Sequence, residues 1–214
     1  MEHIKSFQKR IGATPDGEFG KETLVKAMAF YKISKEQCAN FFGQCSHETG
    51  EFKATTENTN YSVDRMLQIF KSDFDINKDR VISEAEKAKA KSLVGNKKGI
   101  ADFVYANQNG NGNEASKDGS KFLGRGSLQL TGRANYKAFS EWVKDPEVMN
   151  NPELVAGKYY FDSALFFFAR NGLWTIASKI DMESIKKLTK KINGAYNGID
   201  HRIEMTNKYY RLLS

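Results

Sequence analysis

Residues 34–50 read SKEQCANFFGQCSHETG and hold the clearest helix signal in the chain. Ser34 and Gln37, three residues apart, form a capping-box pattern that predicts the start of a helix. We expect this helix to run to about Thr49 and to stop at Gly50. Four residues at helical spacing form its apolar stripe: Cys38, Phe41, Phe42 and Cys45.

Most of the remaining chain is also predicted to be helical. We expect a helix–turn–helix over residues 3–31 and further helices at 62–70, 83–94, 99–106, 151–170, 182–192 and 200–213. Residues 107–126 are rich in Gly and Asn, so they are predicted to form an irregular loop. Few segments alternate with period two, and at most a short β-hairpin is expected near 122–130. The fold class is therefore mainly α.

The composition predicts a soluble, basic protein. The chain has 214 residues, a formal net charge of +7 and a pI of about 9.2. This charge favours a polyanionic partner, and no basic run with interleaved aromatics indicates nucleic acid. Cys38 and Cys45 lie on one predicted helix, about 10 Å apart by helical rise, which is too far for a disulfide.

Neither a signal peptide nor a membrane span is predicted. Residues 1–19 hold no apolar stretch of the required length, and the most apolar run, Phe166–Phe168, is far too short. If the protein acts outside the cytoplasm, we expect something else to release it.

Glu48 and Glu57 are the candidate catalytic pair. Glu48 falls at the edge of the apolar stripe, where partial desolvation favours the protonated form that a general acid needs. Glu57 lies in the polar run Thr55–Tyr61, which suits an ionised base. Two carboxylates in contrasting settings are typical of glycoside hydrolysis, where an inverting enzyme holds them roughly 6.5–9.5 Å apart. On spacing alone, two ordinary surface glutamates remain the alternative.

Four motifs follow one another along the chain. They are HETG at 47–50, ENTNYS at 57–62, GRGSLQLTGRANY at 124–136 and INGAYNG at 192–198, with Arg202 just beyond. In this order they strongly resemble glycoside hydrolase family 19, especially its phage-endolysin branch; the family also contains plant-type chitinases. The resemblance covers about residues 34–214. It implies a two-lobed, lysozyme-like fold with a deep substrate cleft.

The resemblance also implies roles for single residues. Glu48 matches the general acid, and Glu57 matches the base that activates water. Thr131 matches a hydroxyl that helps to hold that water. Five further positions are implied to contribute to the sugar-binding cleft: Gln129, Tyr136, Asn193, Arg125 and Arg202. For Arg125 and Arg202, a purely structural ion pair is the alternative.

The acidic loop at 75–86 fits an EF-hand calcium loop. Its oxygen donors fall at the spacing that such loops use, with a backbone carbonyl at the seventh position: Asp75, Asn77, Asp79, Val81, Ser83 and Glu86. Arg80 departs from the pattern, since it stands where such loops carry Gly. We expect a structural calcium ion that takes no part in the chemistry. The alternative is a solvated loop that caps the following helix.

Two domains are expected. Residues 1–32 resemble a shortened peptidoglycan-binding helical module, which either binds the wall weakly or is a vestigial segment packed on the catalytic domain at 33–214. The predicted enzyme is a monomeric endolysin that cuts β-1,4 bonds of peptidoglycan without a cofactor in the chemistry. It would be made in the host cytoplasm and reach the wall through a holin-type release partner. A chitinase and a non-catalytic, calcium-dependent wall-binding protein are the rival functions.

Overall fold

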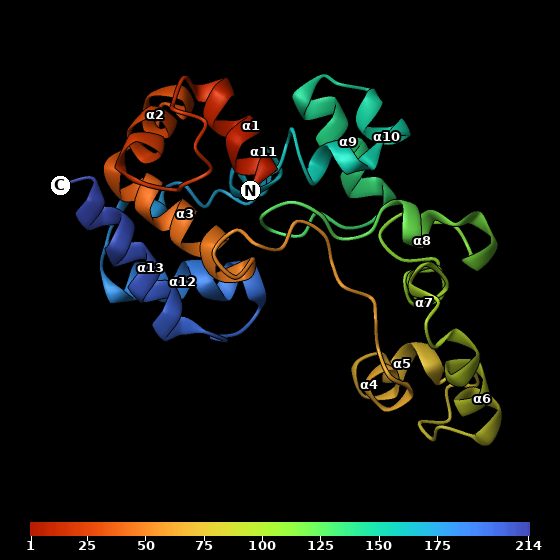
Figure 1. Cartoon of the computed structure of the whole chain (residues 1–214). Helices are drawn as coiled ribbons and strands as arrows, with labels where there is room; N and C mark the ends of the chain where they lie inside the picture. Colours follow the sequence, from red (N-terminus) through yellow and green to blue (C-terminus); the bar gives the residue numbers. More distant parts are fainter. The chain divides into compact units, whose positions relative to one another are not determined.

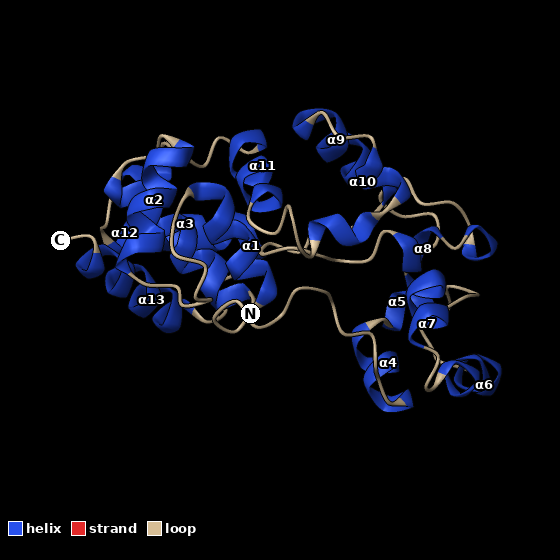
Figure 2. Cartoon of the chain, turned by 45° about the horizontal axis from the view of Figure 1, so that its top comes forward, coloured by secondary structure: helices blue, strands red, loops and turns tan.

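The computed structural model describes residues 1–214. It consists of helices and loops without a β-strand (Figure 2), which confirms the mainly α fold. The chain divides into two compact units. Unit 1 comprises Met1–Thr55, Arg125–Gln129 and Glu153–Ser214, and unit 2 comprises Thr56–Gly124 and Leu130–Pro152. None of the helices is both long enough and apolar enough to cross a membrane.

Unit 1 is built around α3 (Lys35–Glu48), which begins as predicted. The Ser34 hydroxyl accepts a hydrogen bond from the Gln37 backbone, and the Gln37 side chain accepts one from the Ser34 backbone. The remaining helices of unit 1 are α1 (Glu2–Ile11), α2 (Lys21–Tyr31), α11 (Asp162–Arg170), α12 (Met182–Asn193) and α13 (Ile199–Leu212), with a 3-10 turn at Ile176–Ser178. A second 3-10 turn, Pro152–Val155, starts at the last residue of unit 2 and continues into unit 1.

The helix α3 is buried on all sides over residues 38–46. Residues 38–46 are all buried, so protein covers every face of the helix there and not only the expected apolar stripe. Figure 1 shows α13 beside α3, and these two helices share the most extensive contact in the chain. Gly43 permits it, because a Cβ there would lie 2.4 Å from Oγ1 of Thr206. The C-terminal half of α3 therefore packs closely against α13.

Aromatic rings tie the N-terminal residues into the core of unit 1. The ring centroid of Phe7 lies 4.6 Å from that of Phe161, and that of Phe19 lies 4.4 Å from Phe52 and 4.9 Å from Phe42. Residues 1–32 therefore share one hydrophobic core with α3 and α11. Their weak binding of the wall stays a prediction, as does the domain boundary at residue 32.

Unit 2 also consists of helices, none of them longer than 11 residues. They are α4 (Val63–Ile69), α5 (Lys71–Phe74), α6 (Glu84–Leu93), α7 (Lys97–Val104), α8 (Asp118–Lys121), α9 (Arg133–Val143) and α10 (Glu147–Asn150), with a 3-10 turn at Glu114–Ser116. Apolar residues of α4 to α7 form one core cluster: Met66, Phe74, Ala90, Leu93, Ile100 and Val104.

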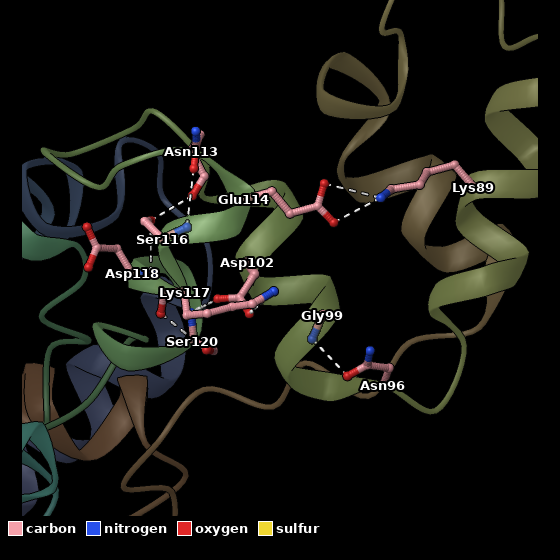
Figure 3. A network of polar contacts seen from close by, with 10 residues as sticks. All are labelled: Lys89, Asn96, Gly99, Asp102, Asn113, Glu114, Ser116, Lys117, Asp118 and Ser120. Carbon is pink, nitrogen blue, oxygen red and sulfur yellow. Dashed lines mark hydrogen bonds and ion pairs between the residues drawn. The ribbon is translucent and has the colours of Figure 1, made fainter.

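Polar contacts fasten the Gly/Asn-rich loop of unit 2 to α6 and α7 (Figure 3). Asp102 on α7 is 3% exposed, and its Oδ1 accepts a hydrogen bond of 2.8 Å from the backbone of Ser120. Nζ of Lys117 lies 3.7 Å from Oδ2 of the same carboxylate. On the other side of the loop, Nζ of Lys89 donates to Glu114 at 2.9 Å. The loop predicted at 107–126 is thus ordered by charges and contains two short helical turns.

One predicted helix has the wrong bounds, and the helix α9 was missed. The helix expected over 151–170 begins only at Asp162. The residues before it bind the segment Arg125–Gln129 instead, since the Tyr160 carbonyl accepts the N–H of Ser127 at 3.0 Å. The helix α9 was not predicted, although Tyr136, Phe139 and Ser140 are buried at helical spacing. The short hairpin allowed near 122–130 does not form.

Replacing Phe7 tests whether the N-terminal segment belongs to the core. Phe7 is 3% exposed, so Phe7→Ala should lower the free energy of unfolding by about 3–5 kcal/mol. Phe30→Ala in the same segment is the matched control, because Phe30 is 48% exposed and its loss should cost less than about 1 kcal/mol. Chemical denaturation of both variants measures the difference. Equal, small effects would contradict the shared core.

Candidate active site

Glu48 and Arg202 form the central contact of unit 1. Glu48 is the last residue of α3, and its Oε1 accepts a short, charged hydrogen bond from Nη2 of Arg202 on α13. The arginine side chain is 1% exposed and that of Glu48 is 24% exposed. The carboxyl group therefore keeps one accessible side while its other side faces a buried cation. The apolar surroundings expected for Glu48 are replaced by this guanidinium.

The other nitrogens of Arg202 are also engaged. Nη1 donates to Oε1 of Gln44 at 2.6 Å, and Nε donates to the carbonyl of Asn197 at 3.1 Å. A buried guanidinium needs such partners, because an unpaired buried charge is strongly unfavourable. Arg202 is thus fixed by α3 and by the loop before α13, and it in turn orients Glu48. The ion pair of Arg202 is made with Glu48, the candidate acid. Arg202 therefore has a structural role and also belongs to the candidate site.

A histidine pair lies beside this contact. Nδ1 of His47 and Nδ1 of His201 are 2.9 Å apart, a distance that requires one of them to donate and the other to accept. Gly198 borders the pair, since a Cβ there would lie 2.0 Å from Cε1 of His47. The end of α3 and the start of α13 therefore meet at a hydrogen bond that depends on protonation.

The chain leaves α3 through a strained turn. Gly50, Glu51 and Phe52 have φ angles of 57°, 58° and 66°, and a left-handed Phe is rare. The backbone of Phe52 donates to Oγ1 of Thr49 at 3.1 Å, and the Phe52 side chain is 1% exposed in the core. Burial of this ring offsets a backbone cost on the order of 1 kcal/mol per residue. The turn fixes the direction in which the chain continues after Glu48.

Arg125 and Gln129 lie in the segment Arg125–Gln129, which belongs to unit 1. The Arg125 side chain is 7% exposed, and its Nη2 donates to Oε1 of Glu153 at 2.6 Å. This contact is the structural ion pair named as the alternative for Arg125. Gln129 has a φ of 53°, and its side chain donates to the carbonyl of Gly126 at 3.0 Å. Strained backbone of this kind is common at ligand sites, which is compatible with a binding role for Gln129. That role stays a prediction.

Glu57 lies in unit 2. Its backbone donates to the Gly124 carbonyl at 2.8 Å, and its Oε1 accepts a hydrogen bond of 2.7 Å from the hydroxyl of Tyr105. Desolvation, together with the hydrogen bond to Glu57 and its charge, raises the pKa of Tyr105. Desolvation and the charge of Glu57 also raise the pKa of Tyr61. Both phenols therefore remain protonated, and Tyr105 is a lasting donor to Glu57.

The three remaining candidates have different surroundings. Thr131 in unit 2 is half-buried, and its carbonyl accepts from the Asn135 side chain at 2.9 Å. Tyr136 is 0% exposed, and its hydroxyl donates to the carbonyl of Leu123 at 2.8 Å, so it packs inside unit 2. Asn193 ends α12 in unit 1, and its Oδ1 accepts from the backbone of Ala195. Their roles toward sugar stay predictions.

No protein-family model matches the sequence. A protein of Haemophilus influenzae named "Glycosyl hydrolase family 19 domain-containing protein" is 37% identical to this chain over 184 residues, which cover 85% of the chain and 80% of the relative. The chain belongs to glycosyl hydrolase family 19. This confirms the family that the four motifs indicated and makes the protein a glycoside hydrolase that acts on glycans.

Three contacts of this family 19 hydrolase were not predicted from the sequence. Gln44 lies four residues before Glu48, on the same helix face, and that spacing could have identified it. The proximity of His201 to His47 and of Tyr105 to Glu57 depends on tertiary packing. No local pattern signals those two contacts.

The acidic loop of the hydrolase matches a calcium loop in part. Arg80 adopts a φ of 70°, the conformation for which Gly is usual, and its N–H donates to Oδ2 of Asp75 at 2.9 Å. Oδ1 of Asp75 is buried and accepts no hydrogen bond. The Glu86 carboxylate instead accepts from the backbones of Ile76 and Ser83.

The side chains of the loop do not converge on one point. No group of three His, Cys, Asp or Glu side chains is placed to hold a metal ion. Hydrogen bonds from Ser83, Ile76 and Asn77 lower the pKa of Glu86, which keeps it ionised as a cap of α6. The backbone and Asp75 therefore fit a cation, whereas Glu86 is engaged elsewhere.

The histidine pair predicts a pH dependence of stability. Partial desolvation and the nearby Arg202 lower the pKa of His47, although Glu48 opposes them. A lowered folded-state pKa means that stability is complete above the unfolded value of about 6.5 and declines as the pH falls from there through the folded value.

In His47→Gln the melting temperature should decline less between pH 7 and pH 5 than in the wild type. The substitution removes a group that binds a proton more readily in the unfolded state, so the slope should change by the equivalent of at most one proton. His3→Gln is the control, because desolvation lowers the pKa of His3 at a separate position. The two changes should therefore add in the double variant. An unchanged pH profile in His47→Gln would contradict the assignment.

Proposed function

We propose that this family 19 hydrolase cuts β-1,4 glycosidic bonds of bacterial peptidoglycan by an inverting mechanism. The observation that carries the proposal is the partly exposed Glu48 carboxyl group oriented by the buried Arg202. The net charge of +7 favours an acidic wall over uncharged chitin as substrate. The same machinery would serve a chitinase, so chitin is the second candidate.

In this mechanism Glu48 gives its proton to the leaving glycosidic oxygen. The proton transfer leaves a carboxylate on Glu48, and the guanidinium of Arg202 stabilises that negative charge as it forms. Glu57 removes a proton from water, which attacks the anomeric carbon from the opposite face of the sugar. Tyr105 donates to the Glu57 carboxylate and limits its orientations. Thr131 is assigned to the attacking water, which its hydroxyl can both donate to and accept from.

An endolysin role extends this proposal. A phage-encoded hydrolase of this kind would act as a monomer, be made in the host cytoplasm, and lyse the cell after a holin-type partner had opened the membrane. The motif order at 47–50, 57–62, 124–136 and 192–198 supports this branch of the family. A non-catalytic, calcium-dependent wall-binding protein is disfavoured, since the chain keeps both Glu48 and Glu57.

Substitution of the two glutamates tests the mechanism. Glu48→Gln and Glu57→Gln should each lower kcat on purified peptidoglycan by about 10²- to 10⁴-fold, because each removes a proton-transfer group. Glu51→Gln is the matched control; its carboxylate is half exposed and contacts only a surface lysine, Lys208.

Mass spectrometry of the released fragments identifies the bond that is cut, and proton NMR of fresh products reports the anomeric configuration. Wild-type activity in Glu48→Gln, or retention of configuration, would overturn the mechanism. Cleavage of soluble chitin oligomers with peptidoglycan left intact would favour the chitinase.

We also propose that the loop at 75–86 binds calcium with a structural role in unit 2. The buried, unpartnered Oδ1 of Asp75 and the left-handed Arg80 support the proposal. Binding would require the Glu86 carboxylate to leave the backbone of Ile76 and turn toward the ion. Because these hydrogen bonds compete with the metal, weak affinity is expected.

Calcium should raise the melting temperature of the wild type. At a free concentration 100 times the Kd, the stabilisation is about 2.7 kcal/mol. Asp75→Asn should remove the shift, whereas Asp64→Asn, which changes an exposed carboxylate outside the loop, should keep it. Differential scanning calorimetry with calcium and with magnesium makes the measurement. A wild type that shows no shift in millimolar calcium would refute the site.

A further inference from the structure

A basic groove runs along the exposed side of α12 in unit 1. It has a volume of about 610 Å³ and is lined by Lys186, Lys187, Lys190 and Lys191, with Ile176 and Tyr196 among its other lining residues. All four lysines are exposed. The groove therefore combines a high density of positive charge with apolar surface.

The sequence of α12 places these charges on one side. Ile185 and Leu188 are buried in unit 1, and they hold the helix so that the lysines face outward. Lys187 pairs with Glu183 at 2.6 Å, and both side chains are well exposed. No ion pair engages the other three lysines of the groove. Nζ of Lys190 lies 5.9 Å from the ring centroid of Tyr196, and none of the three ammonium groups has an anionic partner that would compete with a ligand.

The groove is connected to the candidate acid through a short loop. Tyr196 is 52% exposed and precedes Asn197, whose carbonyl accepts the hydrogen bond from Nε of Arg202. Gly198 packs on His47, next to Glu48. The loop that carries Tyr196 is therefore fixed to the same two helix ends that hold the catalytic carboxyl group.

The chemistry of the groove fits flexible chains that carry carboxylates. Lysine ammonium groups bind carboxylates as mobile point charges, without the fixed geometry that arginine demands. Tyr196 and Ile176 offer apolar surface to the aliphatic carbons between such carboxylates. In peptidoglycan every second sugar bears a peptide stem with free carboxylates, whereas chitin bears none.

We propose that the α12 groove binds the carboxylate-bearing peptide stems of peptidoglycan and so selects wall glycan over uncharged glycan. This inference rests on the proposed peptidoglycan hydrolase function. It assigns substrate selection to Lys186, Lys190 and Lys191, which lie outside the catalytic machinery.

The test compares two substrates and two charge-matched variants. Native peptidoglycan is compared with peptidoglycan whose carboxylates have been converted to neutral amides by carbodiimide and ammonia. The groove variant is Lys186→Gln/Lys190→Gln/Lys191→Gln. The control is Lys71→Gln/Lys91→Gln/Lys98→Gln in unit 2, where three exposed lysines are lost with the same change in net charge.

The wild type and the control should lose about tenfold in kcat/KM when the carboxylates are neutralised, since three exposed charge pairs, each weak alone, are lost together. The groove variant should show a similar loss on native peptidoglycan and almost no further loss on the amidated form. The proposal is overturned if the groove variant responds to amidation as the control does.

A binding measurement separates this inference from the proposed function. A soluble stem tetrapeptide is titrated into the intact wild-type protein while the backbone NMR signals of α12 and of residues 194–198 are followed. Shifts that the groove variant lacks support the groove, even if the wild type cuts no peptidoglycan, in which case the proposed function alone fails. Absence of shifts in the wild type at millimolar peptide overturns the groove.

Discussion

The buried guanidinium of Arg202 is the constraint on which unit 1 depends. Its side chain is 1% exposed, so the fold must supply acceptors for its N–H groups or bear a large desolvation cost. Gln44, Glu48 and the Asn197 carbonyl supply them from α3 and from the loop before α13. Removing one partner from such a buried pair typically costs about 3–5 kcal/mol. The packing of α3 on α13 and the orientation of Glu48 are therefore two results of one requirement.

Burial of Phe52 explains why backbone strain is tolerated nearby. The chain leaves α3 through three left-handed residues, and burial of Phe52 in the aromatic core offsets the cost of that turn. The ring of Phe19 packs tilted against Phe52 and that of Phe161 packs edge-on, so residues from the N-terminal segment and from the start of α11 stabilise the path taken after Glu48. The N-terminal segment thereby contributes to the geometry of the candidate site without touching it.

Local patterns predicted what depends on neighbours in the chain. The capping box at Ser34 and the turn at Gly50 located α3, and four ordered motifs indicated the family. Tertiary contacts decided the rest. The carbonyl of Tyr160 accepts the N–H of Ser127, and the helix expected over 151–170 is shorter as a result. Arg202 donates to Gln44, which lies 158 positions away in the sequence. The prediction of apolar surroundings for Glu48 was wrong for the same reason. The periodicity of one helix cannot reveal a cation that a second helix supplies.

The two glutamates have chemically different partners. A cation stabilises a carboxylate that forms when an acid gives up its proton, and it equally stabilises one that is ionised throughout, so Arg202 beside Glu48 is compatible with either role. A general base begins with its charge and must keep it available to water. A neutral phenol donor such as Tyr105 orients the Glu57 carboxylate without neutralising it. The two proposed catalytic groups thus differ in the charge of their partner, which is a buried cation at Glu48 and a neutral phenol at Glu57.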